Sequence, residues 1–135
     1  MYRNILVPVA FDDGHDTKAA FLAARKLASE NAKFTVFHVM EAIPTYVTAQ
    51  IPAEVLARSH DDAQKALTQM AAGLPGASAV MATGHAGRAI VDHAAAHDID
   101  CIVIASHKPG LENLLLGSTA DRVVRHAKCA VHVLR

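Results

Sequence analysis

The sequence contains no tryptophan, has only two tyrosines and four phenylalanines, and carries no net charge, because thirteen basic residues balance thirteen acidic ones. Without a positive excess to concentrate on phosphates or anionic lipids, nucleic-acid binding and attachment to a membrane surface are disfavoured. No apolar run approaches the roughly 20 residues that cross a bilayer, and the first residues lack a signal-peptide pattern. These absences favour a soluble, cytoplasmic protein.

Cysteine is also scarce. The two cysteines, Cys101 and Cys129, each lead into an apolar strand-like run, and they form neither a C-x-x-C pair nor a disulfide framework. Because free cysteine is among the most buried residue types, we expect two buried, reduced thiols.

The apolar content, 52% of 135 residues, is enough for one core of ordinary size. No internal repeat, low-complexity segment or interdomain linker is visible, and the longest connection without a clear period covers residues 41–52. We therefore expect residues 1–135 to form a single domain.

Apolar segments of strand type alternate with segments of helical period, which is typical of repeated β-α units in a parallel sheet. The first and fourth strands are nearly unbroken apolar runs, as central strands buried on both faces require. The expected strands cover residues 5–9, 34–40, 79–83, 101–105 and 130–134, and the expected helices cover residues 16–30, 53–72, 88–97 and 118–126. The predicted fold class is α/β, with an open, doubly wound, five-stranded parallel sheet in the common order 3-2-1-4-5 and four helices.

The most informative segment for function follows the fourth strand, where a loop leads to Gly117, Ser118 and Thr119 at the start of a helix. Backbone N–H groups at a helix start have no partners within the helix and lie at the positive end of the helix dipole. These three residues therefore form a candidate anion site. For Ser118, a simple helix N-cap is an equally good interpretation.

In an open doubly wound sheet, ligands bind beyond the carboxyl ends of the strands, where the strand order reverses. In the order 3-2-1-4-5 this point lies between strands one and four. The predicted crevice is lined, in addition to the helix start, by Pro8, Val9, Ala10, Ala105, Ser106, His107 and Lys108. Lys108 is either a phosphate ligand that supplies a flexible positive charge or a solvated loop residue.

Nine histidines raise the question of a metal or catalytic site. His93 and His97 have the i, i+4 spacing of two ligands on one helix face, but no H-E-x-x-H signature or third ligand accompanies them. We expect both to be exposed and to hold no metal, and we expect His38 and His132 to be structural. No nucleophile elbow or Walker motif occurs, so a dedicated catalytic centre is not predicted.

The last strand predicts an interface. Residues 130–134 end near the end of the sequence, with no later element to cover the strand's apolar edge, and exposed edges of this kind tend to pair. Antiparallel pairing of two such edges satisfies a two-fold axis, so we expect a homodimer through this strand.

Several segments together resemble the universal stress proteins of the single-domain UspA type. The resemblance is carried by Asn4-Ile-Leu-Val-Pro-Val, Phe37-His-Val-Met, Ile102-Val-Ile-Ala-Ser-His, Leu115-Leu-Gly-Ser and Val123-Val-Arg-His-Ala-Lys-Cys-Ala-Val. It runs from end to end of the chain. It implies a Rossmann-like fold similar to that of the adenine nucleotide alpha hydrolases, a homodimer, and, in one branch of the family, ATP held by a G-x2-G-x9-G-[S/T] loop.

The resemblance also implies that the adenine lies against Val39 and the segment after Pro8, with the phosphates along residues 105–108 and 117–119 and with Mg²⁺ held by those phosphates. Three departures from the ATP-binding pattern stand out. Ala105 replaces the first loop glycine, Lys108 stands near the second, and Ala10 replaces an aspartate near the nucleoside.

The loop Ala-Ser-His-Lys-Pro is, however, similar to the Ala-Ser-His-Arg-Pro loop of the F/G-type bacterial members, which are associated with nucleotide binding. Two functions therefore remain open. The chain is either a stress-response protein that binds an adenine nucleotide, or a dimeric interaction module of the same family that has lost nucleotide binding.

Overall fold

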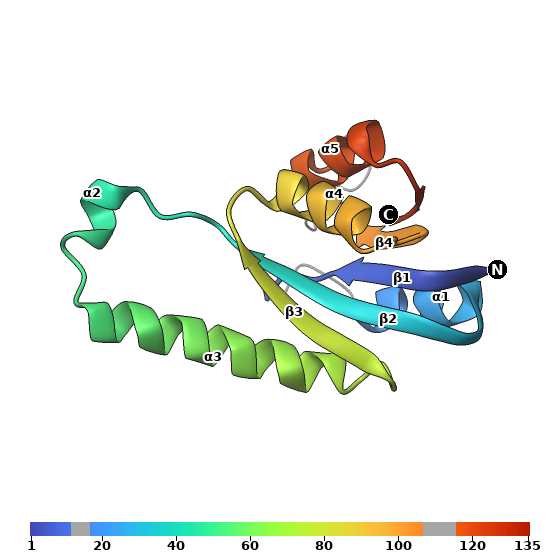
Figure 1. Cartoon of the computed structure of the whole chain (residues 1–135), viewed down its shortest axis with the longest axis horizontal. Helices are drawn as coiled ribbons and strands as arrows, with labels where there is room; N and C mark the ends of the chain where they lie inside the picture. The colour runs from blue at the N-terminus through green and yellow to red at the C-terminus, as the bar shows by residue number, and fades with distance from the viewer. Residues whose placement is uncertain (12–16, 107–115) are drawn as a thin grey trace.

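The computed structural model describes residues 1–11, 17–106 and 116–135. These residues form five strands and five helices, which alternate along the sequence except where α3 follows α2 (Figure 1). They are β1 (Tyr2–Pro8), α1 (Thr17–Leu27), β2 (Ala28–Met40), α2 (Thr45–Thr48), α3 (Ala53–Ala71), β3 (Ala77–Thr83), α4 (Ala86–Ala96), β4 (Cys101–Ala105), α5 (Ser118–His126) and β5 (Ala130–Leu134).

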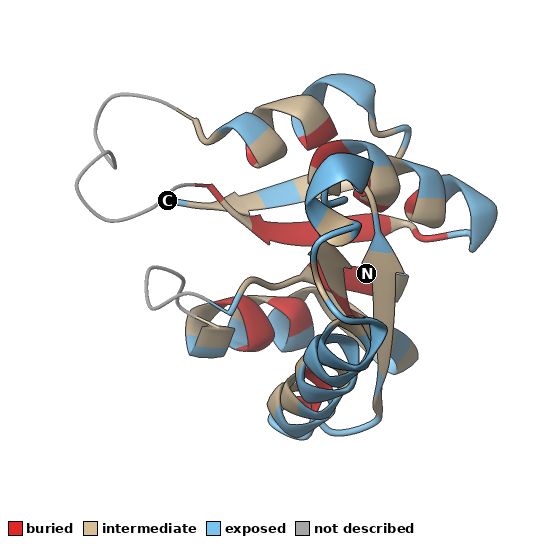
Figure 2. Cartoon of the chain, turned by 90° about the vertical axis from the view of Figure 1, so that its left-hand side faces the viewer, coloured by how far each residue is buried: buried red, intermediate tan, exposed pale blue. Residues whose placement is uncertain are grey.

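The strands form one parallel sheet in the order β3-β2-β1-β4-β5, which confirms the predicted fold class. Helices α1 and α3 contribute to the core on one face of the sheet, and α4 and α5 to the core on the other. Figure 2 shows the buried residues concentrated where the helices meet the middle of the sheet. No helix in the described ranges is long and apolar enough to cross a membrane.

The central strands are buried on both faces, as their composition predicted. Ile5, Leu6 and Val7 of β1 have no exposed surface. Ile5 and Val7 belong to the core with α1 and α3, whereas Leu6 belongs to the core with α4 and α5. A strand that alternates between two cores must be apolar at every position, and this requirement explains the unbroken run.

The expected boundaries of the first helix and second strand were wrong. The helix ends at Leu27 instead of residue 30, and β2 begins at Ala28 instead of residue 34. Ala28 pairs with Tyr2 of β1, and the Ser29 hydroxyl donates to the Tyr2 carbonyl at 3.0 Å. Asn31 adopts a positive φ of 62° within this irregular start. Pairing between distant segments therefore overrides the local helical period.

The expectation of four helices was also wrong, because residues 41–52 contain the short helix α2. Pro44 precedes it as its N-cap, and proline is well suited to that end of a helix. A helix of one turn carries too few residues to produce a periodic apolar pattern.

The two cysteines lie on opposite faces of the sheet, since Cys101 belongs to one core and Cys129 packs against the other. Cys101 is buried, as expected, but Cys129 is only half-buried. Burial, reinforced by the nearby Cys129, raises the pKa of Cys101 to about 11. The Cys101 thiol therefore stays protonated at neutral pH and is a poor nucleophile.

The histidine pair on α4 differs from the expectation. His97 is exposed, but His93 is half-buried and its ring lies 4.6 Å from that of Phe37, which is buried in the core. The rings of His93 and His97 stack with their centroids 3.9 Å apart. Burial and the neighbouring His97 lower the pKa of His93. No group of three metal-ligating side chains occurs within residues 1–11, 17–106 and 116–135.

The amino ends of β1 and β4 are joined by Asp100. Its carboxylate accepts the backbone N–H of Arg3 at 2.8 Å and of Asn4 at 3.0 Å. The Asp100 N–H donates to the Asn4 carbonyl at 3.0 Å, and the Asn4 side-chain amide donates to the carbonyl of His97 at 2.9 Å. These reciprocal bonds hold the start of β1 against the turn that precedes β4.

We predict that Asp100→Ala lowers the free energy of unfolding by about 1–2 kcal/mol, because two backbone donors lose a carboxylate acceptor. Asp100→Asn keeps one carbonyl oxygen and should lose less. Urea unfolding followed by circular dichroism measures both values. Equal stability of Asp100→Ala and the wild type would show that solvent replaces the carboxylate without loss.

We also predict that stability declines as the pH falls below 6.5, the ordinary pKa of histidine, because unfolded His93 takes up a proton that the folded environment disfavours. Above that pH both states are neutral at this site, and the stability is fully present. Urea midpoints at pH 7.5 and 5.5 should differ less in His93→Gln than in the wild type. The exposed His60 provides the control, His60→Gln, which should leave the pH dependence unchanged.

Candidate functional site

The candidate site lies where β1 and β4, neighbours in the sheet, reach its carboxyl edge. Ile5 pairs with Cys101 and Leu6 with Ile102. If this register is continued along the two parallel strands, Val9 lies opposite Ala105 at the carboxyl edge. The Val9 N–H donates to the Phe37 carbonyl at 2.8 Å and so extends the pairing of β1 with β2. The structure thus brings the first and fourth strand ends together as predicted.

Ser106, the first residue beyond β4, is the central polar group of this edge. Its N–H donates to the carbonyl of Leu134 at 2.9 Å, and its carbonyl accepts the Gly117 N–H at 2.5 Å. Only 3% of its surface is exposed. Its hydroxyl has no hydrogen-bond partner among the described residues. Within those residues it is the only buried side-chain nitrogen or oxygen atom without a partner.

The bond between Ser106 and Gly117 places the start of α5 directly beside the end of β4. The N-cap of α5 is Gly117, which has no side chain with which to cap the helix. Ser118 is therefore the first helical residue and not the N-cap that its type suggested. Since the Gly117 N–H is already paired, the N–H groups at Ser118 and Thr119 remain as the donors that a helix start offers to an anion.

Close packing of α4 holds α5 in this position. A Cβ atom added at Gly87 would lie 2.7 Å from the Cδ atom of Arg122 and 3.0 Å from its Cβ atom. Gly87 is buried at the start of α4, so a larger residue there would require the Arg122 side chain or α5 itself to shift. The placement of the α5 amino end thus depends on a glycine in a different helix.

The end of β1 is fixed by an imidazole that sequence reasoning had treated only as structural. His38 Nδ1 lies 2.9 Å from the Val9 carbonyl oxygen. A carbonyl only accepts, so Nδ1 carries the proton and donates it. The ring centroids of His38 and Phe11 are 4.0 Å apart. No spacing rule in the sequence indicated the contact between Phe11 and His38.

The predicted site residues are therefore only partly described. Pro8 is the last residue of β1, and Val9 and Ala10 follow it at the edge. Val39 lies near the end of β2 and packs against the core shared with α4 and α5. Two predicted residues, His107 and Lys108, lie outside the described residues. Their roles stay predictions.

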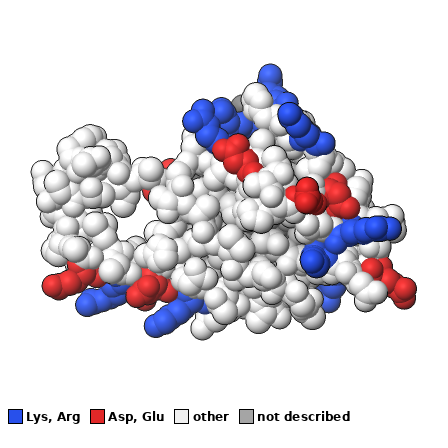
Figure 3. Space-filling model, in the orientation of Figure 1, with Lys and Arg blue, Asp and Glu red and all other residues white. Residues whose placement is uncertain are grey.

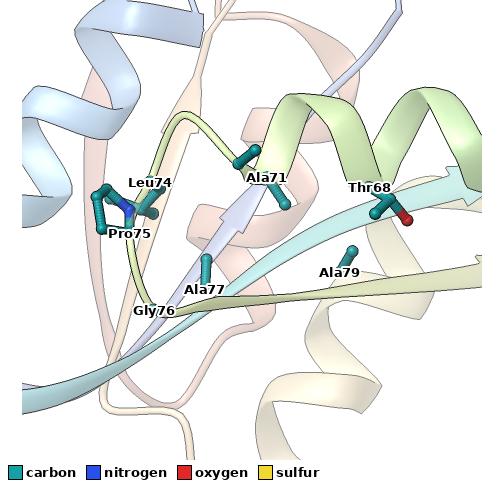
Figure 4. A pocket seen from close by; sticks show the side chains of 8 residues that line it. Thr68, Ala71, Leu74, Pro75, Gly76, Ala77 and Ala79 are labelled. Atoms are coloured by element: carbon teal, nitrogen blue, oxygen red, sulfur yellow. The ribbon is translucent and has the colours of Figure 1, made fainter.

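Two cavities in the described ranges lie away from this edge. One, of about 250 Å³, lies between the end of α3 and the start of β3 (Figure 4). It is lined mainly by small side chains and contains no titratable group. The other, of about 530 Å³, lies between α1 and α3 and is flanked by Lys18 and Arg25. Neither contains a combination of nucleophile, base and electrophilic donor that would indicate catalysis.

Three solved proteins of similar fold contain adenine nucleotides. A universal stress protein in complex with cAMP has a TM-score of 0.67 and 24% identity, with 99% of this chain and 97% of that chain covered. The universal stress protein of Archaeoglobus fulgidus in complex with dAMP has a TM-score of 0.63 and 19% identity, with 99% of this chain and 98% of that chain covered. The Arabidopsis thaliana protein of the same family with AMP bound has a TM-score of 0.62 and 18% identity, with 98% of this chain and 90% of that chain covered. At these identities the likeness shows a shared fold.

Sequence relationships are closer for other proteins. A universal stress protein of Thermus aquaticus, from the QAH/OAS sulfhydrylase 3′ region, is 30% identical over 138 residues, which cover 100% of both chains. The solved UspA of Lactobacillus plantarum is 31% identical with a TM-score of 0.71, covering 99% of this chain and 98% of its own. The model of the universal stress protein family matches residues 1–135. The chain belongs to the universal stress protein family.

Proposed function

We propose that this protein binds an adenine nucleotide, ATP with Mg²⁺, at the carboxyl edge between β1 and β4, and that it acts in the cytoplasm in the response to stress. The observation that carries the proposal is the buried hydroxyl of Ser106, which has no partner among the described residues, beside the start of α5, whose N-cap is a glycine. A ligand with anionic oxygens would pair with both.

The energetics favour such a ligand. A buried hydroxyl without a partner costs about 1–3 kcal/mol, which an acceptor oxygen from a bound molecule would recover. The helix dipole of α5 adds a preference for negative charge at the same place. An oxygen of the phosphate chain satisfies both requirements, and Mg²⁺ is usually held by the phosphates themselves.

The choice of an adenine nucleotide is supported by the cAMP, dAMP and AMP bound to proteins of the same fold. We place the base near Val39 and the segment from Pro8 to Ala10, and the phosphates near Ser106, Ser118 and Thr119. Lys108 would add positive charge where the loop glycines of the ATP-binding pattern are absent.

We propose that the protein binds the nucleotide without a dedicated catalytic step. The described residues near the edge include no activated nucleophile, and the Cys101 thiol has a raised pKa and is buried in the core. The competing function is a dimeric interaction module without a nucleotide. Ala10 and Ala105, which replace an aspartate and a glycine of the ATP-binding pattern, favour that alternative.

We predict that Ser106→Ala weakens ATP binding about ten- to hundredfold, which corresponds to the roughly 1.5–3 kcal/mol of a hydrogen bond to a charged group. The unliganded variant should be at least as stable as the wild type, because the substitution removes an unpaired buried hydroxyl. Isothermal calorimetry with ATP and Mg²⁺, together with urea unfolding, measures both effects.

The exposed Ser78 on β3 supplies the matched control, since Ser78→Ala should change neither quantity. Lys108→Ala in the same titration should weaken binding by about one to two orders of magnitude. Absence of heat with millimolar ATP in the wild type would refute nucleotide binding. Equal affinity in Ser106→Ala would refute the role given to its hydroxyl.

We further propose a homodimer through β5, an edge strand of the sheet whose outer side pairs with no other described strand. The Leu134 carbonyl points to β4, where it accepts the Ser106 N–H. Because successive backbone groups of a strand alternate in direction, the N–H of the neighbouring Val133 points to the open edge.

Val133→Pro should therefore remove an intermolecular donor without breaking the pairing with β4, and it should shift the protein to monomers in sedimentation velocity. Val133→Thr keeps the N–H and should stay dimeric. If Val133→Pro remains a dimer while circular dichroism shows a native fold, the interface lies elsewhere.

A further inference from the structure

Residues 42–52, referred to here as the knob, protrude from the molecule between β2 and α3. The knob includes α2 and stands beyond the carboxyl ends of β2 and β3 (Figure 1). None of its residues is buried, and α2 does not pack extensively against any other helix or strand in the described ranges.

The surface of the knob is unusual in two respects. No residue from Ala42 to Pro52 is charged. Three of the eight exposed large hydrophobic side chains in the described ranges lie in it, namely Ile43 at 49%, Tyr46 at 75% and Val47 at 36% exposure. Uncharged segments that gather exposed apolar side chains are typical of surfaces that cover another molecule.

The position of the knob indicates what it covers. It follows Met40, the last residue of β2 and the neighbour of Val39, where the proposed function places the base. The Met40 carbonyl accepts the Gly84 N–H at 2.9 Å, so the root of the knob is fixed to the end of β3. Figure 3 shows a hollow between the knob and the body of the molecule, with charged side chains along the α3 side of the protruding part and acidic atoms at its neck.

The chemistry of the knob suits a nucleobase. A base has two flat faces of low polarity, and aromatic side chains stack on such faces without requiring a charge. Phosphates, in contrast, would find no cation among residues 42–52. The proline caps of α2 and α3, Pro44 and Pro52, restrict the backbone at both ends of the turn, so that it would move as a unit.

We propose that the knob closes over the base of a nucleotide bound at the carboxyl edge, with the Tyr46 ring stacked on the base and with Ile43 and Val47 excluding water around it. This inference rests on the proposed function. It adds a mobile element and a base-contacting residue that lie outside the phosphate-binding segments.

The scarcity of aromatic residues supplies a direct probe. The chain has no tryptophan, so Tyr46→Trp introduces a single fluorophore into the knob. Titration with ATP and Mg²⁺ should change its emission with the same midpoint that calorimetry gives. Inorganic tripolyphosphate, which has no base, should leave the emission unchanged even where it competes with ATP.

Affinity provides the second measurement. Tyr46→Ala should weaken ATP binding about ten- to hundredfold, the range expected for loss of one base–aromatic stack, whereas Tyr46→Phe should retain the wild-type affinity. Leu22→Ala is the matched control, because Leu22 is an exposed apolar residue, at 48%, on α1 outside the site. It should leave the affinity unchanged.

The outcomes separate this inference from the function on which it rests. No ATP binding by the wild type refutes the proposed function. Binding with full affinity in Tyr46→Ala, or without any emission change in Tyr46→Trp, refutes closure of the knob. An emission change that follows protein concentration instead of ATP would identify a second copy of the chain as the occupant and would also overturn the proposal.

Discussion

The pairing of β1 with β4 is the constraint on which the rest of the structure depends. Their register brings together two strands that are separated by four helices and two other strands in the sequence. Both lie in the middle of the sheet, so each must be apolar on its two faces and be covered by helices on both sides. The chain reverses its direction of winding at this pair, and the reversal leaves the carboxyl edge between them uncovered.

The two ends of this strand pair differ in how their polar groups are satisfied. At the amino end, the Asp100 carboxylate and the Asn4 amide each bond to two backbone groups. At the carboxyl end, the backbone of Ser106 is fully paired while its side chain has no partner in the described ranges. Native proteins rarely leave buried polar atoms unpaired without a reason. The first end therefore serves stability, and the second is the place to expect a ligand.

Features of the fold and of the site could be predicted from the sequence where they depend on residues close together in the chain. The observed bounds of β4, α5 and β5 agree with those predicted from the apolar runs and from the glycine at position 117. Burial on both faces of a strand and the start of a helix each produce a recognisable pattern within a few residues. The early start of β2 and the half-burial of His93 depend on contacts with Tyr2 and Phe37, which are distant in sequence. The strand ends of the site were predictable from topology, whereas the Ser106–Gly117 bond and the contact between His38 and Val9 were not.

In the proposed site, the departures from the family's ATP-binding pattern would replace backbone recognition of the phosphates with side-chain recognition. Glycines let backbone N–H groups approach phosphate closely, and these donors are already ordered in the folded chain. A serine hydroxyl held in a buried position, as at Ser106, is nearly as well ordered, but a lysine or a mobile tyrosine loses conformational freedom when it binds. A site built from Ser106, Lys108 and Tyr46 would therefore bind more weakly than a glycine-lined loop with the same number of contacts. Its occupancy would then follow the cellular nucleotide concentration, which is a useful property for a protein that responds to changing conditions.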